Sequence, residues 1–264
     1  MIINVKFVSM MKRISSILSV LLLMLASFTV DAQSVYGDVN GDGVVNISDV
    51  NAVIGVILGN NTPKPPIDTH EWVDLGLPSG TLWATCNVGA TAPEDYGDYF
   101  AWGETAPKEV YNWSNYKWCH GSSTTLTKYC TNSSYGTVDN KTELDPEDDA
   151  AYVNWGSSWR MPTYDQQTEL RTKCTWTWTT QSGVKGLLVT GSNGNTLFLP
   201  AAGYRYDSSL FDAGSWGSYW SRTLYSGNPD YAYFVYFIFE DVYWNDYYYR
   251  FQGFPVRPVR VPQN

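Results

Sequence analysis

Tyr231-Ala-Tyr-Phe-Val-Tyr-Phe-Ile-Phe239 is apolar or aromatic at every position. A strand with one face in water alternates apolar and polar residues, whereas a strand covered on both faces is apolar throughout. This stretch therefore predicts a central, buried β-strand.

Shorter apolar runs earlier in the chain predict further strands. Val184–Val189 and Thr196–Leu199 flank Thr190-Gly-Ser-Asn-Gly-Asn195, which is rich in turn-forming residues. Two such runs joined by a short Gly-containing segment predict a β-hairpin. Thr81–Cys86 follows a Pro-Ser-Gly turn and predicts another short strand.

Two helix starts interrupt this β pattern. Thr163-Tyr-Asp-Gln166 is a capping box, with Thr163 as N-cap, and the helix that it begins is expected to run to about Lys173. Asp145-Pro-Glu-Asp-Asp149 has the acid content of the first turn of a short helix. The predicted fold class is α+β, mainly β with one or two helices.

Six stretches, in order along most of the region 69–264, resemble the Fibrobacter succinogenes major paralogous domain, a family abundant in exported proteins of the Bacteroidetes. They are Val73–Ala90, Tyr96–Thr105, Ser158–Thr163, Phe198–Arg205, Tyr219–Ser221 and Val256–Arg260. The family is similar to C-type-lectin-like folds, so the resemblance implies a mixed domain in which the N- and C-terminal strands pair. The closing stretch Val256–Val261 suits that arrangement. The family has no agreed activity, and a fold does not specify a function.

The first 32 residues are expected to be a signal peptide. Lys12 and Arg13 precede the mostly apolar stretch Ile14–Val30, and Val30-Asp-Ala32 offers a small-residue cleavage site. No later stretch approaches ~18 unbroken apolar residues, so no membrane span is expected in the mature chain. The protein is therefore predicted to be secreted or held at the cell surface.

Residues 33–60 contain a predicted calcium loop of the EF-hand type. Oxygen-bearing side chains recur at alternate positions, Gly43 stands where the loop turns sharply, and Val44 offers its carbonyl. The predicted ligands are Asp38, Asn40, Asp42, Val44, Asn46 and Asp49. An ion-free turn rich in Asp, Asn and Gly is the alternative.

An apolar stripe follows this loop at helical spacing: Val50, Val53, Ile54, Ile57 and Leu58. Loop and stripe together resemble one dockerin type I repeat and predict a small EF-hand-like loop–helix unit. A full dockerin has two repeats and holds a cohesin partner, and the second repeat is missing here. The resemblance implies calcium and a possible cohesin-like partner. Residues 61–68 contain three prolines and are expected to be a linker.

Composition and net charge argue against a disordered chain and against binding to nucleic acid or to an anionic membrane. Hydrophobic residues make up 44% of the chain, which argues against disorder along its full length. The formal net charge of −9 argues against binding to nucleic acid or to an anionic membrane surface.

Four cysteines lie beyond the signal peptide. Export permits disulfides, and four cysteines allow three pairings. Cys119–Cys130 is favoured because it closes a short loop, which leaves Cys86–Cys174. Buried free thiols are the alternative.

The sequence has no clear catalytic motif: H-E-x-x-H, G-x-S-x-G and a P-loop are all missing. Glu94, Asp95, Asp98 and Glu104 lie near Trp102 in sequence, and a carboxylate pair beside an aromatic residue could serve a glycosidase. Loop acids in solvent, or a bridge to a buried arginine, are favoured instead. The protein is therefore expected not to be an enzyme.

The C-terminal third is rich in Tyr and Trp interleaved with Asn, Asp and Ser. Aromatic rings cover the apolar C–H faces of sugars, and tyrosine also suits protein-binding surfaces because it has few rotors to freeze. Tyr219, Trp220 and Arg257 are expected in the core. The candidate ligand-binding residues are Tyr225, Asn228, Tyr231, Trp244, Asn245, Tyr247 and Tyr249; ordinary packing is the alternative for them.

These patterns together predict an exported, non-catalytic binding module for a glycan or a protein ligand, with a calcium-binding appendage. The alternatives are a structural or adhesion component of a surface assembly and, less favoured, a polysaccharide hydrolase.

Overall fold

The computed structural model describes residues 69–239 and 241–260, all within the unit Asp68–Asn264, without the side chains of residues 242–246. The predicted signal peptide, calcium loop and linker lie outside the described residues. Within the described residues, none of the helices has the length and apolar character that a membrane crossing requires.

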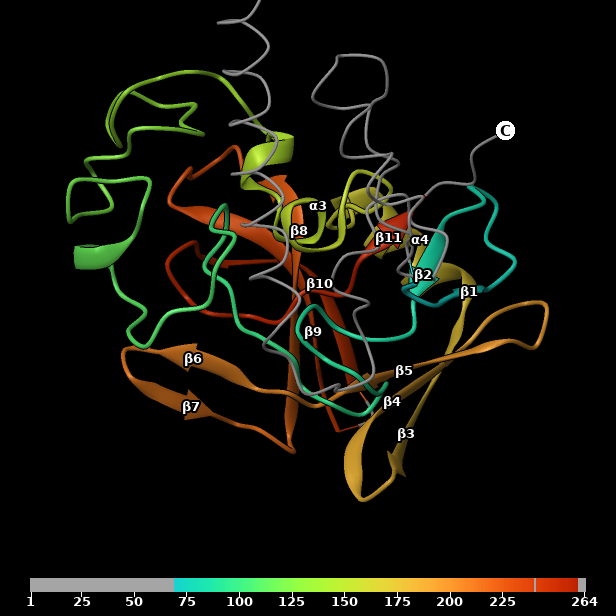
Figure 1. Ribbon diagram of the computed structural model, residues 1–264. Helices are drawn as coiled ribbons and strands as arrows, with labels where there is room; N and C mark the ends of the chain where they lie inside the picture. Colours follow the sequence, from blue (N-terminus) through green and yellow to red (C-terminus); the bar gives the residue numbers. More distant parts are fainter. Residues whose placement is uncertain (1–68, 240, 261–264) are drawn as a thin grey trace, which may run out of the picture. The chain divides into compact units, whose positions relative to one another are not determined.

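The longest strands form one antiparallel sheet. It contains β8 (Trp216–Leu224), β9 (Tyr231–Ile238) and β10 (Asp241–Tyr249) in the order β10-β9-β8. Figure 1 shows these strands running through the middle of the view. β9 is the central strand, as its unbroken apolar sequence predicts, because neighbours on both sides satisfy its backbone.

A second meander contains β3 (Thr175–Gln181), β4 (Val184–Thr190) and β5 (Thr196–Pro200). The predicted hairpin between β4 and β5 is confirmed. β3 was not predicted, although its sequence alternates Thr and Trp. Its turn to β4 places Ser182 at φ 48° and Gly183 at φ 85°, and two positive φ values in a two-residue loop match the twist of a hairpin.

A third sheet joins both ends of the described region. β2 (Leu82–Ala84) lies between β1 (Trp72–Asp74) and β11 (Val259–Arg260), and both neighbours are antiparallel to it. A separate hairpin consists of β6 (Tyr204–Tyr206) and β7 (Ser209–Phe211). The domain is therefore mainly β, as predicted.

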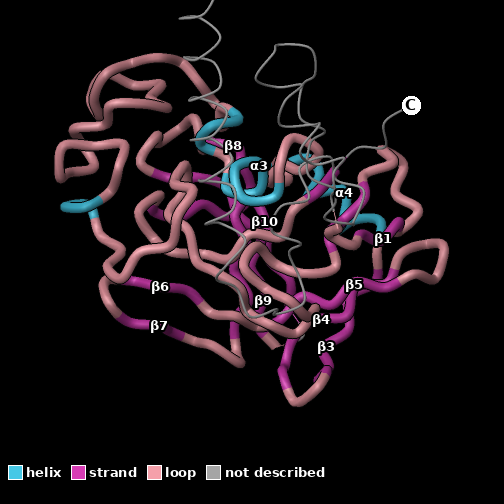
Figure 2. The backbone as a smooth tube through the Cα atoms, viewed as in Figure 1, coloured by secondary structure: helices cyan, strands magenta, loops and turns pink. Residues whose placement is uncertain are grey.

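Within residues 69–239 and 241–260, the helices are few and short. They are η1 (Trp113–Asn115), η2 (Pro146–Asp148), α3 (Ala150–Trp155) and α4 (Tyr164–Lys173). Figure 2 shows that the chain from β2 to α3 is mostly loop.

Both predicted helix starts are confirmed. Thr163 Oγ1 accepts the backbone N–H of Gln166 at 3.0 Å, and Gln166 Oε1 accepts that of Thr163 at 2.9 Å. The Asp145–Asp149 segment forms η2, and Asp149 then caps α3 by accepting the N–H of Ala151 at 2.9 Å.

Buried aromatic rings fill the core, and their polar atoms are bonded to backbone. Trp220 is fully buried and stacks on Phe254 at 4.1 Å between ring centroids. Its Nε1 donates to the carbonyl of Phe100 at 2.9 Å, and Trp102 Nε1 donates to that of Ser221 at 2.8 Å. Such bonds remove the penalty of burying an indole N–H. The core assignments of Tyr219 and Trp220 are confirmed.

Arg257 is also a core residue, as predicted. Its guanidinium is buried and donates to Asn87 Oδ1 at 2.8 Å and to the carbonyl of Ala84 at 3.1 Å. Burial lowers the pKa of Arg257 below its ordinary value. These hydrogen bonds connect the end of β2 and the chain after it to the stretch that leads into β11.

The disulfide prediction is wrong, because all four cysteines are free in the structure. Cys119 Sγ donates to the carbonyl of Trp113 at 3.2 Å, and Cys130 Sγ donates to that of Asn132 at 3.1 Å. Each of these two thiols is therefore hydrogen-bonded to a backbone carbonyl nearby in the sequence. Short sequence separation says nothing about whether two Cβ atoms face each other, which a disulfide requires.

Candidate ligand-binding site

Four of the predicted ligand-binding residues form two tyrosine stacks at one end of the β8-β9-β10 sheet. Tyr225 and Tyr247 stack at 3.8 Å between ring centroids with 7° between their planes. Tyr231 and Tyr249 stack at 4.6 Å with 26° between their planes. We call these four residues the tyrosine stacks.

Strand register explains why the stacks form. Tyr249 pairs directly with Tyr231 across β10 and β9, and Tyr247 lies two residues before Tyr249 on the same strand. Residues two apart share one face of a strand, and directly opposed residues have close Cβ atoms. Tyr225 immediately follows the end of β8 at Leu224, which places it at the same end of the sheet.

The other three predicted residues have different outcomes. The backbone carbonyl of Asn228 accepts the N–H of Tyr231 at 3.0 Å in the turn between β8 and β9, and its Oδ1 accepts the hydroxyl of Tyr135 at 3.2 Å. Asn228 therefore shapes this turn. The side chains of Trp244 and Asn245 lie outside the described residues.

A pocket of about 420 Å³ lies beside the stacks, a size typical of small-molecule sites. Its lining residues are Tyr204, Trp216, Ser218, Tyr231, Phe234, Tyr236, Tyr247, Tyr248, Tyr249, Gln252 and Phe254. Three of them were predicted. Phe234 and Tyr236 were missed because β9 reads as a strand buried on both faces. The other lining residues were missed because they reach the pocket from separate segments of the chain.

The hydroxyls of Tyr231 and Tyr204 keep their protons. Burial raises the pKa of Tyr231 well above its ordinary value, and a hydrogen bond with Tyr249 raises it further. Burial and the nearby Asp212 raise the pKa of Tyr204. At neutral pH these hydroxyls can therefore donate hydrogen bonds to a ligand.

Arg250 fastens the loops around the site to the sheet. It is fully buried and follows Tyr249, the last residue of β10. Its guanidinium donates to the carbonyl of Pro229 at 2.8 Å and to that of Tyr129 at 3.0 Å. Both carbonyls lie in loops, so one side chain fixes the β8–β9 turn against the loop that precedes η2. Sequence analysis gave Arg250 no role, since its partners are distant in the chain.

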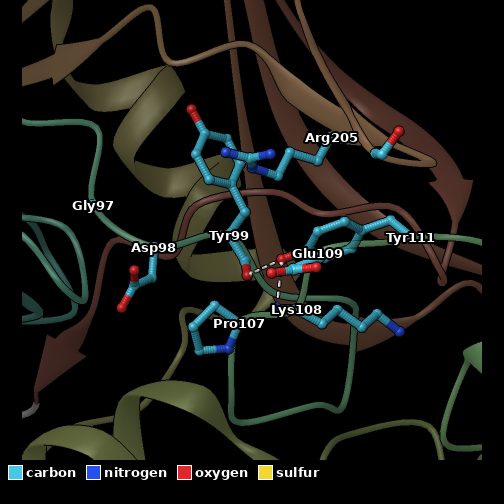
Figure 3. Close-up of a pocket in the computed structure, with 9 residues that line it drawn as sticks. Gly97, Asp98, Tyr99, Pro107, Lys108, Glu109, Tyr111 and Arg205 are labelled. Carbon is cyan, nitrogen blue, oxygen red and sulfur yellow. Dashed lines mark hydrogen bonds between the residues drawn. The ribbon is translucent and has the colours of Figure 1, made fainter.

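A second pocket, of about 460 Å³, is polar and carries charges of both signs (Figure 3). Asp98, Lys108, Glu109 and Arg205 line it, together with aromatic residues. The guanidinium carbon of Arg205 lies 5.1 Å from the ring centre of Tyr99. None of the predicted ligand-binding residues with a described side chain lines this pocket.

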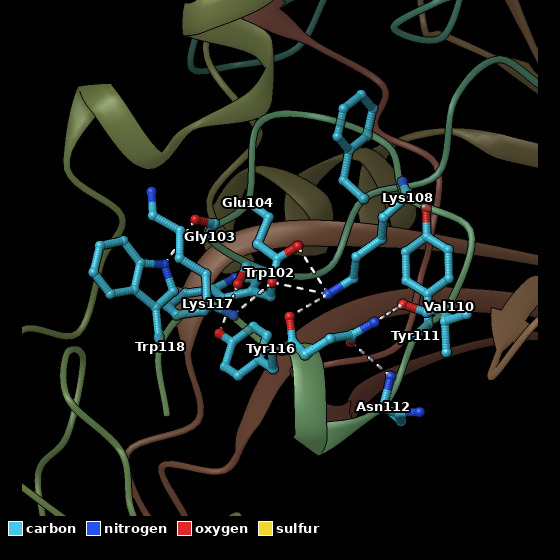
Figure 4. A network of polar contacts seen from close by, with 12 residues as sticks. Trp102, Gly103, Glu104, Lys108, Val110, Tyr111, Asn112, Tyr116, Lys117 and Trp118 are labelled. Atoms are coloured by element: carbon cyan, nitrogen blue, oxygen red, sulfur yellow. Dashed lines mark hydrogen bonds and ion pairs between the residues drawn. The ribbon is translucent and has the colours of Figure 1, made fainter. Parts of the chain in front are cut away.

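Two of the carboxylates considered for a glycosidase, Glu104 and Asp95, make the contacts of structural loop acids. Glu104 is 8% exposed, and its Oε1 accepts Lys108 Nζ at 3.0 Å and the backbone N–H of Lys117 at 2.8 Å (Figure 4). Asp95 Oδ2 accepts the N–H of Ala92 at 3.0 Å within its own turn. Glu104 thus meets lysine, not the buried arginine of the sequence interpretation.

Another acidic cluster holds lysines. Oxygens of Asp145, Glu147 and Asp148 lie within 4.8 Å of one another, as cation ligands can. Lys128 Nζ lies 2.6 Å from carboxylate oxygens of both Asp145 and Asp148. Its ammonium therefore occupies the place that a cation would take.

Comparison with known families identifies the N-terminal segment. Residues 36–70 match the dockerin type I domain. This stretch includes all six predicted calcium ligands. Dockerin type I domains bind calcium through EF-hand-like loops, bind cohesins and are non-catalytic modules. No curated protein and no solved structure matches the chain. Residues 36–70 are therefore a dockerin type I domain, and calcium is its cofactor.

Proposed function

We propose that this chain is an exported, non-catalytic binding module that holds a glycan or a protein ligand at the tyrosine stacks and the adjoining pocket. The observation that carries the proposal is the pairing of Tyr225 with Tyr247 and of Tyr231 with Tyr249 beside that pocket. Stacked tyrosines offer large, rigid apolar faces with hydroxyls at their edges, at a small cost in conformational entropy.

The dockerin segment supplies calcium binding and attachment in this proposal. Asp38, Asn40, Asp42, the carbonyl of Val44, Asn46 and Asp49 hold the ion. A cohesin-like protein is the proposed partner of this segment. Signal peptide 1–32 directs the chain out of the cell, and the product is secreted or remains at the surface.

The fold that we propose for residues 69–264 is the C-type-lectin-like fold of the Fibrobacter succinogenes major paralogous domain. The β1-β2-β11 sheet supports this proposal, since it joins the N- and C-terminal strands. Long loops on a mixed core, such as the chain from β2 to α3, also support it.

A structural or adhesion role is the second candidate, and one observation favours it. Tyr206, Leu210 and Phe211 on the β6–β7 hairpin are each at least 40% exposed. Exposed apolar residues gathered on one hairpin are typical of an association surface.

A glycan array probed with the full chain, with calcium and with chelator, tests the proposal. Saturable binding that is lost on Tyr247→Ala supports it, with Tyr206→Ala as a matched control because both tyrosines are exposed. Binding lost only on Tyr206→Ala would move the function to the hairpin. No binding to the array in either condition would favour a protein partner or the structural role. Release of reducing ends from a polysaccharide would favour the hydrolase.

A further inference from the structure

Six rings that line the pocket form a closed circuit of contacts, which we call the aromatic circuit. In order they are Tyr204, Trp216, Tyr236, Phe234, Tyr248 and Phe254, with consecutive centroids 5.5 to 6.4 Å apart. Phe234 and Phe254 are at most 6% exposed, whereas Trp216 and Tyr248 are 38% and 41% exposed. The circuit therefore has a buried floor and an exposed rim.

Gln252 lines this pocket and carries a buried hydrogen-bond acceptor without a partner. It is 3% exposed, and its Oε1 has no hydrogen-bond partner among the described residues. A buried acceptor without a donor destabilises a fold, and native structures seldom keep one without a reason. Ser218, which is 2% exposed, adds a hydroxyl to the same lining.

Resting on the proposed function, we infer that this pocket binds one uncharged pyranose ring of a glycan. The apolar C–H faces of the sugar pack on the aromatic circuit, and one sugar hydroxyl donates to Oε1 of Gln252. Binding then satisfies the acceptor that folding leaves buried. The tyrosine stacks, three members of which also line the pocket, contact a further part of the glycan.

The chemistry of the lining separates this ligand from two others. None of the described side chains that line the pocket carries a charge, so an acidic sugar finds no counter-ion there. A quaternary ammonium suits an aromatic cage, but it has no N–H or O–H to donate to Gln252. A neutral sugar offers both an apolar face and hydroxyl donors.

The test titrates the full chain with the methyl glycosides of neutral hexoses, with methyl glucuronide and with tetramethylammonium, by tryptophan fluorescence and calorimetry. We expect neutral glycosides to bind and the other two probes to bind at least tenfold more weakly. Trp216→Ala should weaken binding about tenfold or more, because an exposed rim ring is removed. Trp72→Ala is the matched control, since Trp72 is 48% exposed on β1 and does not line the pocket.

Gln252→Met distinguishes a ligand contact from a structural residue. Methionine keeps the shape and removes the acceptor, so we expect about a tenfold loss of affinity together with an unchanged or raised melting temperature. A lowered melting temperature with unchanged affinity would overturn the inference. Equal or tighter binding of methyl glucuronide or tetramethylammonium would also overturn it.

The outcomes also separate this inference from the proposed function. Glycan binding that survives Trp216→Ala and Gln252→Met but is lost on Tyr247→Ala refutes the pocket and leaves the proposed module standing. Failure of every glycan and every neutral glycoside to bind refutes this inference and leaves a protein ligand or the structural role.

Discussion

Nε of Arg250 donates a 2.8 Å hydrogen bond to the hydroxyl of Tyr116, 134 positions earlier in the chain. The same guanidinium lies 4.9 Å from the ring centre of Trp102. A buried cation is costly unless it is hydrogen-bonded, and here three backbone carbonyls and one phenol accept four hydrogen bonds from it. One buried guanidinium therefore holds the loops around the candidate site together.

Arg250→Met should destabilise the domain by about 3 kcal/mol or more, because several buried acceptors lose their donor at once. Denaturant unfolding measures this change. Arg222→Met is the control, since its partner Glu143 is 43% exposed and surface pairs contribute little. Arg250→Lys should recover only part of the loss, because an ammonium lacks the planar fork. Equal stability of the Met and wild-type proteins would contradict the assignment.

Thr163→Ala should lower stability by about 1 kcal/mol, because α4 loses the side-chain oxygen that accepts the Gln166 N–H. Thermal unfolding followed by circular dichroism is a suitable measurement. Thr163→Ser keeps the oxygen and should remain close to wild type. A serine variant as unstable as the alanine variant would point to packing instead of capping.

The Lys128 cluster should make stability depend on pH in the acid range. Burial alone raises the pKa of Asp148, but hydrogen bonds from Lys128, Tyr129 and Lys117 outweigh it and hold the pKa below its ordinary value. A carboxylate whose pKa is lowered by folding contributes stability that is present above its unfolded pKa and is lost as the pH falls through the folded pKa.

Asp148→Asn removes this contribution. Its deficit in unfolding free energy relative to wild type should be constant between about pH 7 and pH 5 and should shrink as the pH falls toward about 2. Urea unfolding across this range gives the difference directly, and Glu71→Gln at an exposed position is the control. A deficit that stays constant down to pH 2 would show that the ion pairs do not stabilise the fold.

Asp38→Ala combined with Asp42→Ala should abolish any rise in melting temperature on addition of calcium, because the loop loses two of its ligands. Scanning calorimetry of the full chain with calcium and with chelator shows this. Asp165→Ala lies outside residues 36–70 and should leave the response intact. A double variant that still responds to calcium would place the ion elsewhere.

Local patterns predicted the elements whose causes are local. The capping box at Thr163, the hairpin around Thr190–Asn195 and the central strand from Tyr231 each depend on neighbours along the chain. The β3 strand escaped prediction because its Thr-Trp alternation lacks aliphatic residues and its Ser182-Gly183 turn resembles many loops.

The pocket and the loop arrangement depend on contacts that no local pattern records. Trp220 Nε1 meets the carbonyl of Phe100 120 positions away, and Tyr204 and Phe254 close the aromatic circuit from distant segments. The four predicted tyrosines were identified by composition alone. Which tyrosine stacks on which became clear only from the structure.

The β1-β2-β11 sheet has a mechanical consequence. Trp72 at the start of β1 pairs with Ala84, and Arg260 at the end of β11 pairs with Leu82, so the outer ends of the two strands lie at opposite ends of β2. Tension applied through these ends pulls β1 and β11 in opposite directions along β2. The ladder hydrogen bonds then carry the load together in shear, instead of opening one after another as in a zipper. A module tethered at one end and loaded at the other would resist force through its shortest strands.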